Sequence, residues 1–428
     1  MNDAMRTEWN QRANTDAHFY VAFGRRNQSE EEFFATAADV MPAFEQEFPR
    51  LIALPNELQA LEIGCGPGRL MLSMSRYFGG VHGVDVSDDM LALARQRLRD
   101  QPNLHLHQCA GSDLKMFSDG SFDFVYSYAV FQHIPSADIV ISYLSEAQRV
   151  LRPGGVLRCQ IRGVAPLPSE MLRASGTWTG CWFTAEDLAK FSKERRFPLV
   201  AISGLNTQYM WATFRKPVEP SLSCSAAKMR VKAITAAADG GSRIPNRGPA
   251  AAASLWIDGA VDSISLAEAQ VYIGDGEQLG CYVSPVSAIG GCQLNTRLLD
   301  GLDPGEYQVK LMISGQTVPS PHPIDIFVAP PHAPRVISVS DGINLRSENR
   351  IETSSSKVSI EDLGNPGQVS FTLAGLAVEE LQHECTDPIT SRFDFAFKLA
   401  PNTPAGRQSL IVRVGDHELD PIALEITG

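Results

Sequence analysis

The stretch LEIGCGPGRL, Leu61 to Leu70, decides how this chain folds. Three glycines, Gly64, Gly66 and Gly68, alternate with other residues after an apolar run and before a helical pattern, MLSMSRYF. Glycine adopts backbone angles that a Cβ atom blocks, so the chain is expected to turn sharply here from a strand into a helix. Free N–H groups at the start of a helix favour a polar or anionic group. The loop is therefore a predicted ligand cradle, with a simple tight turn as the alternative.

Strand-like and helix-like segments alternate around this loop over residues 59–215. The expected strands are QALEIG, VHGVDV, LHLHQCA, FDFVYSYAV and GVLRCQIRG, and LVAISG and TQYMWATFRK are expected to close the sheet as an antiparallel pair. Helical patterns lie between the strands, one of them with Ser87 as its N-cap, and two further amphipathic stretches precede the first strand. This alternation predicts a parallel sheet with helices on both faces.

The character of the sequence changes at Pro217. Short alternating runs such as ASLWIDG, QVSFTLAG and SLIVRVGD then recur between turn residues, which is typical of β-sandwiches. The stretch PGEYQVKLMISG matches AGRQSLIVRVGD about 100 residues later, so the region is an expected internal repeat. The predicted domains are residues 1–217, 225–330 and 331–428.

Composition limits the possible partners. The 428 residues carry a net charge of −12, which argues against nucleic acid or an anionic membrane as the main partner. The polar first twenty residues lack the apolar core of a signal peptide, and no apolar run approaches the length of a membrane span. Eight cysteines show no CxxC pair and no metal-like spacing, so a cytoplasmic protein with reduced thiols and no metal site is expected.

Two carboxylates flank the glycine loop in sequence. Glu62 lies inside the strand, and Asp85 ends the next strand about twenty residues later. An acidic residue at the end of the second strand accepts hydrogen bonds from ribose hydroxyls, whereas Glu62 suits an ammonium group better than a pyrophosphate. A GxGxxG loop suggests a nicotinamide dinucleotide, but Glu62 inside the strand and the short distance to Asp85 together argue against one here.

These residues resemble the class I S-adenosylmethionine-dependent methyltransferases over residues 5–216. The resemblance rests on four motifs in order, LEIGCGPGR, GVDVSDDML, SFDFVYSYAVFQHI and EAQRVLRPGG. It implies a Rossmann-like α/β fold whose seven-stranded sheet has its last strand antiparallel, and S-adenosyl-L-methionine as cofactor. The implied cofactor residues are Tyr20, Glu62, Gly64, Cys65, Gly66, Gly68, Asp85, Val86, Met90, Gly111, Ser112, Asp113 and Ser127.

Their implied roles differ. Glu62, Gly64 and Gly66 would hold the methionine end, and Asp85 the ribose; a helix cap is the alternative for Asp85. Val86 and Met90 would pack on the adenine, although Met90 also suits an ordinary core. The sequence departs from the family where an acidic residue receives the adenine amino group, because Gly111 and Ser112 align there and Asp113 follows. Trp9 and Tyr20 belong to leading helices that often form a lid, with simple packing as the alternative for Trp9.

His133 is the expected catalytic base, since it follows the fourth strand and its ordinary pKa suits proton transfer at neutral pH. The alternative is that it only packs the loop. Tyr126, Gln132, Trp178 and Tyr209 are candidates for the acceptor site, and Glu146 and Arg149 for a helix-surface pair without chemistry.

The β half resembles immunoglobulin-like domains of the IPT/TIG sort. That resemblance implies either a structural appendage or a docking module for a glycan or a protein. The sequence as a whole predicts a methyltransferase that acts on an oxygen or nitrogen of a small molecule or saccharide. A non-catalytic scaffold whose β repeats carry the function is the main alternative, and an NAD-dependent oxidoreductase is a weaker one.

Overall fold

A computed structural model gives the fold of the chain. It describes residues 2–22, 28–51, 53–164, 180–205, 207–218, 228–260, 264–287, 290–298, 302–320, 322–330, 333–342, 348–387 and 390–427. Contacts divide the chain into two units. The first contains Met1–Thr15 and Phe34–Ala329, and the second contains Asp16–Phe33 and Pro330–Gly428.

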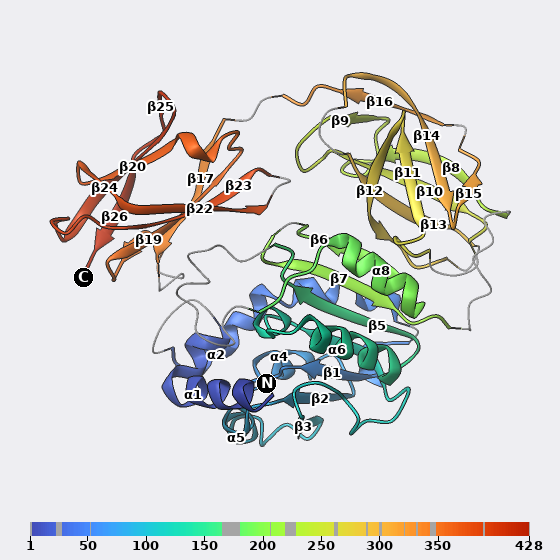
Figure 1. The fold of residues 1–428 in the computed structure, drawn as a ribbon, viewed down its shortest axis with the longest axis horizontal. Helices are drawn as coiled ribbons and strands as arrows, with labels where there is room; N and C mark the ends of the chain where they lie inside the picture. The colour runs from blue at the N-terminus through green and yellow to red at the C-terminus, as the bar shows by residue number, and fades with distance from the viewer. Residues whose placement is uncertain are drawn as a thin grey trace. The chain divides into compact units, whose positions relative to one another are not determined.

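The first seven strands form a doubly wound sheet, drawn in blue to green in Figure 1. Their order is β3-β2-β1-β4-β5-β7-β6. Strands β1 to β5 pair in parallel, and β7 runs antiparallel to both β5 and β6, as the sequence predicts. The strands are β1 Gln59–Ile63, β2 Gly80–Asp85, β3 Leu104–Gln108, β4 Phe122–Ser127, β5 Leu151–Ile161, β6 Leu199–Ser203 and β7 Met210–Arg215.

Helices cover both faces of this sheet because alternate strand residues point to opposite sides. On one face Phe124 packs with side chains of α4 and α5, and on the other Val125 packs with side chains of α6 and α8. The helices are α4 Arg69–Met74, α5 Asp88–Arg97, α6 Ala137–Val150 and α8 Ala185–Arg195. None of the helices that the structure describes is long and apolar enough to cross a membrane.

The segment before the sheet is more broken than its sequence pattern suggests. Helix α1, Asn2–Val21, is interrupted at Asp16, which has extended backbone angles. The second amphipathic stretch becomes several short helical segments, and Pro42 begins one of them at the first helical position, where its missing N–H is tolerated. These segments are α2 Glu30–Ala35, η1 Thr36–Asp39, α3 Pro42–Glu45, η2 Phe48–Arg50 and η3 Pro55–Glu57.

The first β domain packs its strands around one apolar core that includes Leu255, Leu294 and Leu311. Strand β12 joins its two sheets and also pairs with β6 of the α/β domain at Tyr282 and Ala201. The strands are β8 Arg230–Ala236, β9 Arg243–Pro245, β10 Ala252–Asp258, β11 Ala269–Ile273, β12 Gly276–Val283, β13 Cys292–Arg297, β14 Gly305–Ile313, β15 Gln316–Val318 and β16 Pro323–Phe327.

The second β domain has two sheets, β17-β19-β23-β22 and β18-β26-β24-β20-β21. Both contribute to one core, for example through Phe395 and Leu410, so the region has the layers of a sandwich. The immunoglobulin-like assignment of both β domains stays a prediction. The strands are β17 Arg335–Asp341, β18 Arg350–Ile351, β19 Ser355–Glu361, β20 Val369–Leu373, β21 Leu376–Ala377, β22 Glu379–Asp387, β23 Arg392–Lys398, β24 Gly406–Val414, β25 His417–Glu418 and β26 Ile422–Ile426.

The two β domains have similar strand registers, and their relation as a repeat stays a prediction. Gly305 pairs with Ile326 in the first β domain, and Gly406 pairs with Ile426 in the second. Strands β10 and β19 have similar surroundings. Ile257 in β10 and Ile360 in β19 are both buried, and each pairs with an antiparallel neighbour, β8 and β17. The three domain boundaries stay predictions.

Candidate functional site

The glycine loop makes a tight turn at the carboxyl end of β1. Gly64, Gly66 and Gly68 all have positive φ angles, of 75°, 51° and 87°. A Cβ atom on Gly64 would lie 2.3 Å from a methyl group of Val130, and one on Gly68 would lie 2.4 Å from Leu98. Both glycines therefore also serve close packing of the loop. Of the three glycines, Gly66 is the one for which we still expect the ligand to lie directly against the backbone.

Glu62 is a buried carboxyl group on β1, with 4% of its surface exposed. The Tyr126 hydroxyl donates a hydrogen bond of 3.0 Å to Glu62 Oε2. Burial raises the pKa of Glu62 to about 8, although Tyr126 and the charge of Arg69 both lower it. A buried carboxylate is stable only with a donor or a cation beside it. The arrangement fits a ligand that brings an ammonium group to Glu62.

Asp85 joins the loop to the next helix. Its carboxylate accepts hydrogen bonds from the backbone N–H groups of Gly66 and Ser87, both at 2.8 Å. Burial raises the pKa of Asp85, and these backbone donors lower it. Ser87, and not Asp85, caps α5, since its Oγ accepts from the N–H of Met90. Asp85 thus fixes Gly66 next to the place where the sequence predicts the ribose.

The first half of α1 is bound to the start of α5. Arg6, Asn10 and Asn14 are spaced four residues apart and so lie on one face of the helix. The contacts are Arg6 Nε to Asp88 Oδ2 at 2.7 Å, Ser87 Oγ to Asn10 Oδ1 at 2.6 Å, and Asn14 Nδ2 to Asp89 Oδ2 at 2.6 Å. We call these three residues of α1 the polar latch. It places α1 directly beside the residues that follow Asp85.

His133 lies in the short turn η4, Phe131–His133, after β4. It is buried, and the Trp9 ring meets its ring edge-on at a centroid distance of 5.4 Å. Its Nε2 lies 3.3 Å from Gln132 Nε2, and Gln132 Oε1 accepts from Gln160 Nε2 at 3.2 Å. A buried polar chain therefore leads from His133 to β5. Trp9 thus contacts the loop after β4, and the lid role suggested for it stays a prediction.

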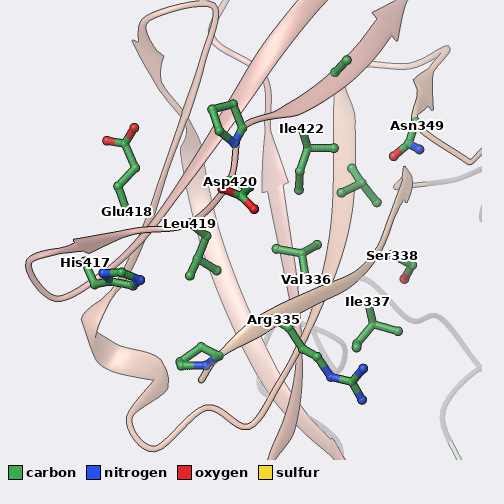
Figure 2. Close-up of a pocket in the computed structure, with 14 residues that line it drawn as sticks. Arg335, Val336, Ile337, Ser338, Asn349, His417, Glu418, Leu419, Asp420 and Ile422 are labelled. Carbon is green, nitrogen blue, oxygen red and sulfur yellow. The ribbon is translucent and has the colours of Figure 1, made fainter. Parts of the chain in front are cut away.

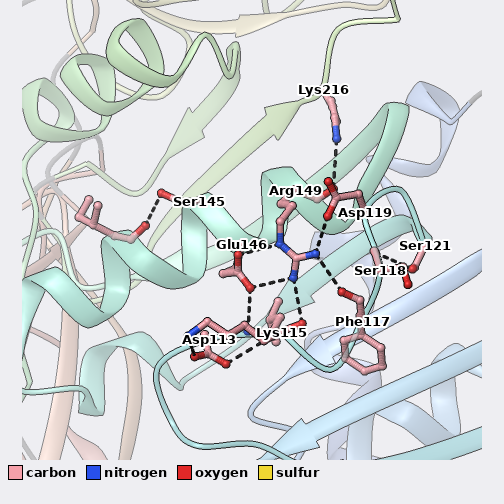
Figure 3. Close-up of polar contacts among 12 residues, drawn as sticks. Asp113, Lys115, Phe117, Ser118, Asp119, Ser121, Ser145, Glu146, Arg149 and Lys216 are labelled. Carbon is pink, nitrogen blue, oxygen red and sulfur yellow. Dashed lines mark hydrogen bonds and ion pairs between the residues drawn. The ribbon is translucent and has the colours of Figure 1, made fainter.

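The loop that carries Gly111, Ser112 and Asp113 is held in place by α6 (Figure 3). Arg149 donates to the carbonyls of Leu114 and Phe117, at 3.0 and 2.9 Å, and pairs with Asp119. Glu146 accepts from the Leu114 N–H at 3.0 Å and from Arg149, so the arginine fork and the loop backbone share one carboxylate. Glu146 and Arg149 form the expected pair on α6, and in addition both residues hold the loop.

Asp113 itself contacts Lys115, two residues further along the same loop. Its carboxylate forms an ion pair with Lys115 at 2.9 Å, and that hydrogen bond lowers its pKa. The adenine contact predicted for Gly111, Ser112 or Asp113 stays a prediction. So do the cofactor contacts predicted for Tyr20, which belongs to the second unit, and for Val86.

The other predicted residues occupy three kinds of position. Cys65, Met90 and Ser127 are buried, and Ser127 Oγ donates to the Ile63 carbonyl at 2.9 Å. Tyr126 is fully buried against Glu62, which argues against the acceptor-site role proposed for it. Tyr209 is partly exposed. Trp178 lies outside the described residues.

Sequence patterns missed the polar latch and Gln160. The four-residue spacing of Arg6, Asn10 and Asn14 is a signal for one helix face, but nothing in the sequence says what that face contacts. Gln160 stands in the apolar run GVLRCQI, where a polar residue signals either a hydrogen-bond network or a site. Its amide also bonds Ala129 and Gln208, so it organises the carboxyl ends of two strands.

The second β domain has a groove of about 840 Å³ between β17 and the segment of β25 and β26 (Figure 2). Apolar residues such as Val336 and Ile422 line it together with His417, Glu418 and Asp420. At the corresponding place in the first β domain, the backbone N–H of Val231 donates a hydrogen bond to the Pro319 carbonyl, so the two edges are joined there. The groove is thus a difference between the two repeats.

Comparisons with known proteins place the residues of the first site in a methyltransferase domain. Residues 61–159 match the model of a family described as a methyltransferase domain. Phosphoethanolamine N-methyltransferase 2 of Caenorhabditis elegans is 36% identical over 97 residues, 22% of this chain and 22% of that protein. A ubiquinone biosynthesis O-methyltransferase of Cereibacter sphaeroides is 25% identical over 196 residues, 44% of this chain and 78% of that protein.

A solved geranyl diphosphate C-methyltransferase of Streptomyces coelicolor is 14% identical, with a TM-score of 0.39 over 50% of this chain and 98% of its own. The chain spans only about a fifth of the length of the first relative above. The family match supports a methyltransferase domain with S-adenosylmethionine as its cofactor.

Proposed function

We propose that this chain, with its S-adenosylmethionine-dependent methyltransferase domain, transfers a methyl group to an oxygen or nitrogen atom of a small molecule or a saccharide. The observation that carries the proposal is the buried Glu62 carboxyl beside the glycine loop, with Asp85 fixed at the end of the adjacent strand. A ligand with an ammonium group and neighbouring hydroxyls fits this pair of carboxyl groups.

The protein's own residues have clear tasks in this proposal. Glu62 receives the ammonium group, Asp85 accepts from the ribose hydroxyls, and the polar latch holds α1 over the start of α5. S-adenosylmethionine, when bound, supplies a methyl group activated by a positive sulfur. The protein therefore has to align an acceptor and exclude water more than it has to activate the donor.

His133 has two possible tasks, and its contact favours one of them. A general base needs a free ring nitrogen within reach of the acceptor proton. Nε2 of His133 instead lies 3.3 Å from the amide of Gln132, which Gln160 holds in turn. We propose that His133 and Gln132 shape and orient the acceptor side, and that base catalysis needs this contact to break.

The β domains serve docking of a substrate or partner in this proposal. The first of them belongs to the same unit as the methyltransferase domain, with Leu266 packed against both cores. A scaffold whose β domains alone carry the function is the alternative. The intact Glu62, glycine loop and Asp85 favour the enzyme, because a pure scaffold needs none of them. A cytoplasmic location stays a prediction.

Calorimetric titration of the full chain with S-adenosylmethionine tests the proposal, with NAD as the comparison ligand. We expect micromolar binding of S-adenosylmethionine, at least tenfold weaker binding by Glu62→Gln and Asp85→Ala, and no binding of NAD. Glu57→Gln, a charge-neutralising change on the turn before β1, is the matched control and is expected to bind normally. Failure of the intact chain to bind would sink the enzyme proposal.

Binding then justifies a search for the acceptor. Transfer of a radiolabelled methyl group to pools of phenols, amines and saccharides identifies the class. Binding without transfer to any pool would favour the scaffold alternative.

A further inference from the structure

We infer that the first β domain carries a binding site for a neutral saccharide, on the outer face of β8, β10 and β13 around Trp256. The inference deepens the docking role in the proposed function by giving it a surface and a ligand class. It rests on contacts of the β domain alone, so it can be tested without the cofactor.

Trp256 is a large aromatic side chain on the outer face of its strand. Its neighbours Leu255 and Ile257 are buried, whereas 43% of Trp256 is exposed. Its indole N–H donates to Thr235 Oγ1 at 3.1 Å, which satisfies the polar atom and fixes the ring. A fixed aromatic ring in contact with water offers a flat apolar surface at little cost in conformational entropy.

A hollow of about 320 Å³ lies beside this ring. It has the size of a small-ligand site. Groups that form hydrogen bonds and apolar groups share its lining, which consists of Lys232, Trp256, Ile257, Asp258, Ser284, Pro285, Ser287, Gly291, Cys292 and Gln293. A sugar ring has the matching chemistry, because it combines apolar C–H faces with hydroxyl edges that both donate and accept.

Gln293 is oriented by its neighbours. Its amide nitrogen donates to Ser254 Oγ at 2.9 Å and to Asn295 Oδ1 at 2.8 Å. A glutamine amide has two N–H donors and one carbonyl oxygen, so these contacts use both donors. The oxygen is then the group that is left to accept from a ligand hydroxyl.

The charges in the hollow favour a neutral ligand. Asp258 lies 3.8 Å from Lys232 Nζ, so the lining holds one cation and one anion that offset each other. Arg230, outside the lining, also approaches Asp258 at 3.8 Å. A carboxylate paired in this way accepts hydroxyl hydrogen bonds but does not favour an anionic polymer.

The second β domain shows that the fold does not need a tryptophan here. Trp256 pairs with Gln293 across the sheet, and the corresponding pair in the repeat is Ser359 with Asp394. Ser359 Oγ donates to Asp394 at 2.6 Å, and Lys357 pairs with the same carboxylate at 2.7 Å. The same strand position thus accepts a small polar residue in one repeat and an exposed aromatic ring in the other, which favours a binding role over a packing role.

The first test is a glycan array with neutral and acidic oligosaccharides, probed with the labelled full chain without cofactor. Calorimetry with the strongest neutral glycan follows. We expect Trp256→Ser, which installs the residue of the sister repeat, to weaken binding at least tenfold without lowering the melting temperature. Gln293→Ala, which keeps the ring, is expected to weaken binding about threefold or more.

Ile337→Ser, which removes an exposed apolar side chain from β17 of the second β domain, is the control and is expected to bind like the unaltered chain. The inference is overturned if no neutral glycan binds, if only acidic glycans bind, or if Trp256→Ser binds normally. Normal cofactor binding together with any of these results leaves the proposed methyl transfer intact. If the chain binds a neutral glycan but not the cofactor, only the proposed methyl transfer is contradicted.

Discussion

The Tyr126 hydroxyl donates a hydrogen bond of 3.0 Å to Oε2 of Glu62, and the two residues are register partners on adjacent parallel strands. The sheet itself thus holds the hydroxyl against the carboxyl group. This one donor does not offset the burial, which raises the pKa of Glu62 to about 8. We therefore expect Glu62 to carry a proton at neutral pH and to lose it when a cationic ligand binds.

Binding of S-adenosylmethionine is expected to tighten as the pH rises from 6 to about 8. Glu62 must lose its proton to receive the ammonium group, and one such proton gives a slope of up to about tenfold per pH unit. Glu62→Gln should bind weakly with no such slope. Calorimetry in two buffers of different ionisation enthalpy measures the released proton. Equal slopes for both proteins would contradict the role of Glu62.

The stability of the unliganded protein is expected to fall as the pH rises from 4.5 to about 8. A carboxyl group whose pKa is higher in the folded than in the unfolded chain stabilises the fold at low pH, and this contribution is lost as the pH rises from 4.5 to about 8. The full shift corresponds to at most about 5 kcal/mol. Melting curves of Glu62→Gln should show a flatter dependence on pH. If the melting temperature of Glu62→Gln depends on pH as steeply as that of the unaltered chain, Glu62 does not make this contribution.

The polar latch is expected to support cofactor binding. Asn10→Ala with Asn14→Ala removes contacts to the first turn of α5, each worth about 1 kcal/mol, and frees α1 beside the site. We expect cofactor affinity to fall about five- to thirtyfold. Gln11→Ala, on an exposed position of the same helix, is the control. An unchanged dissociation constant in the double variant would show that α1 is not part of the cofactor site.

Arg50 is expected to hold the first β domain and the α/β domain in one unit. Its guanidinium is buried, pairs with Glu47 at 2.6 Å and donates to the Val283 carbonyl at 2.6 Å. Arg50→Met removes the donor of the buried Val283 carbonyl and one partner of Glu47, which keeps Thr213 and Arg158, so we expect a loss of about 1–3 kcal/mol. Melting temperature and amide exchange near Val283 measure the effect. Arg99→Met, at an exposed ion pair, should change stability by less than about 0.5 kcal/mol, and equal losses in both variants would refute the role of Arg50.

Acid is expected to destabilise the edge of the sheet through His82. Burial, with His105 and His107 nearby, lowers the pKa of His82 from 6.5 to about 4. A histidine with a lowered folded-state pKa contributes stability above pH 6.5, and this is lost as the pH falls toward 4. The stability of His82→Phe should fall less steeply with pH over that range. The stability of His417→Asn, a change at an exposed residue, should fall as it does in the unaltered chain. If His82→Phe loses stability in acid as the unaltered chain does, His82 is not the cause of that loss.

The sequence alone determined the alternation of strands and helices in the α/β sheet, the glycine turn and the Ser87 cap. These features depend on local patterns, since side-chain periodicity and glycine conformations act within a few residues. It also placed Glu62 and Asp85 at the loop, because adjacent parallel strands bring their carboxyl ends to one edge.

Only the tertiary structure decided which distant groups meet. Arg50 and Val283 are 233 positions apart, and the polar latch reaches α5 from more than 70 residues away. No local pattern encodes such partners, because burial and hydrogen bonding select them only after the chain has folded. The same reason explains why the raised pKa of Glu62 and the exposed ring of Trp256 became visible only in three dimensions.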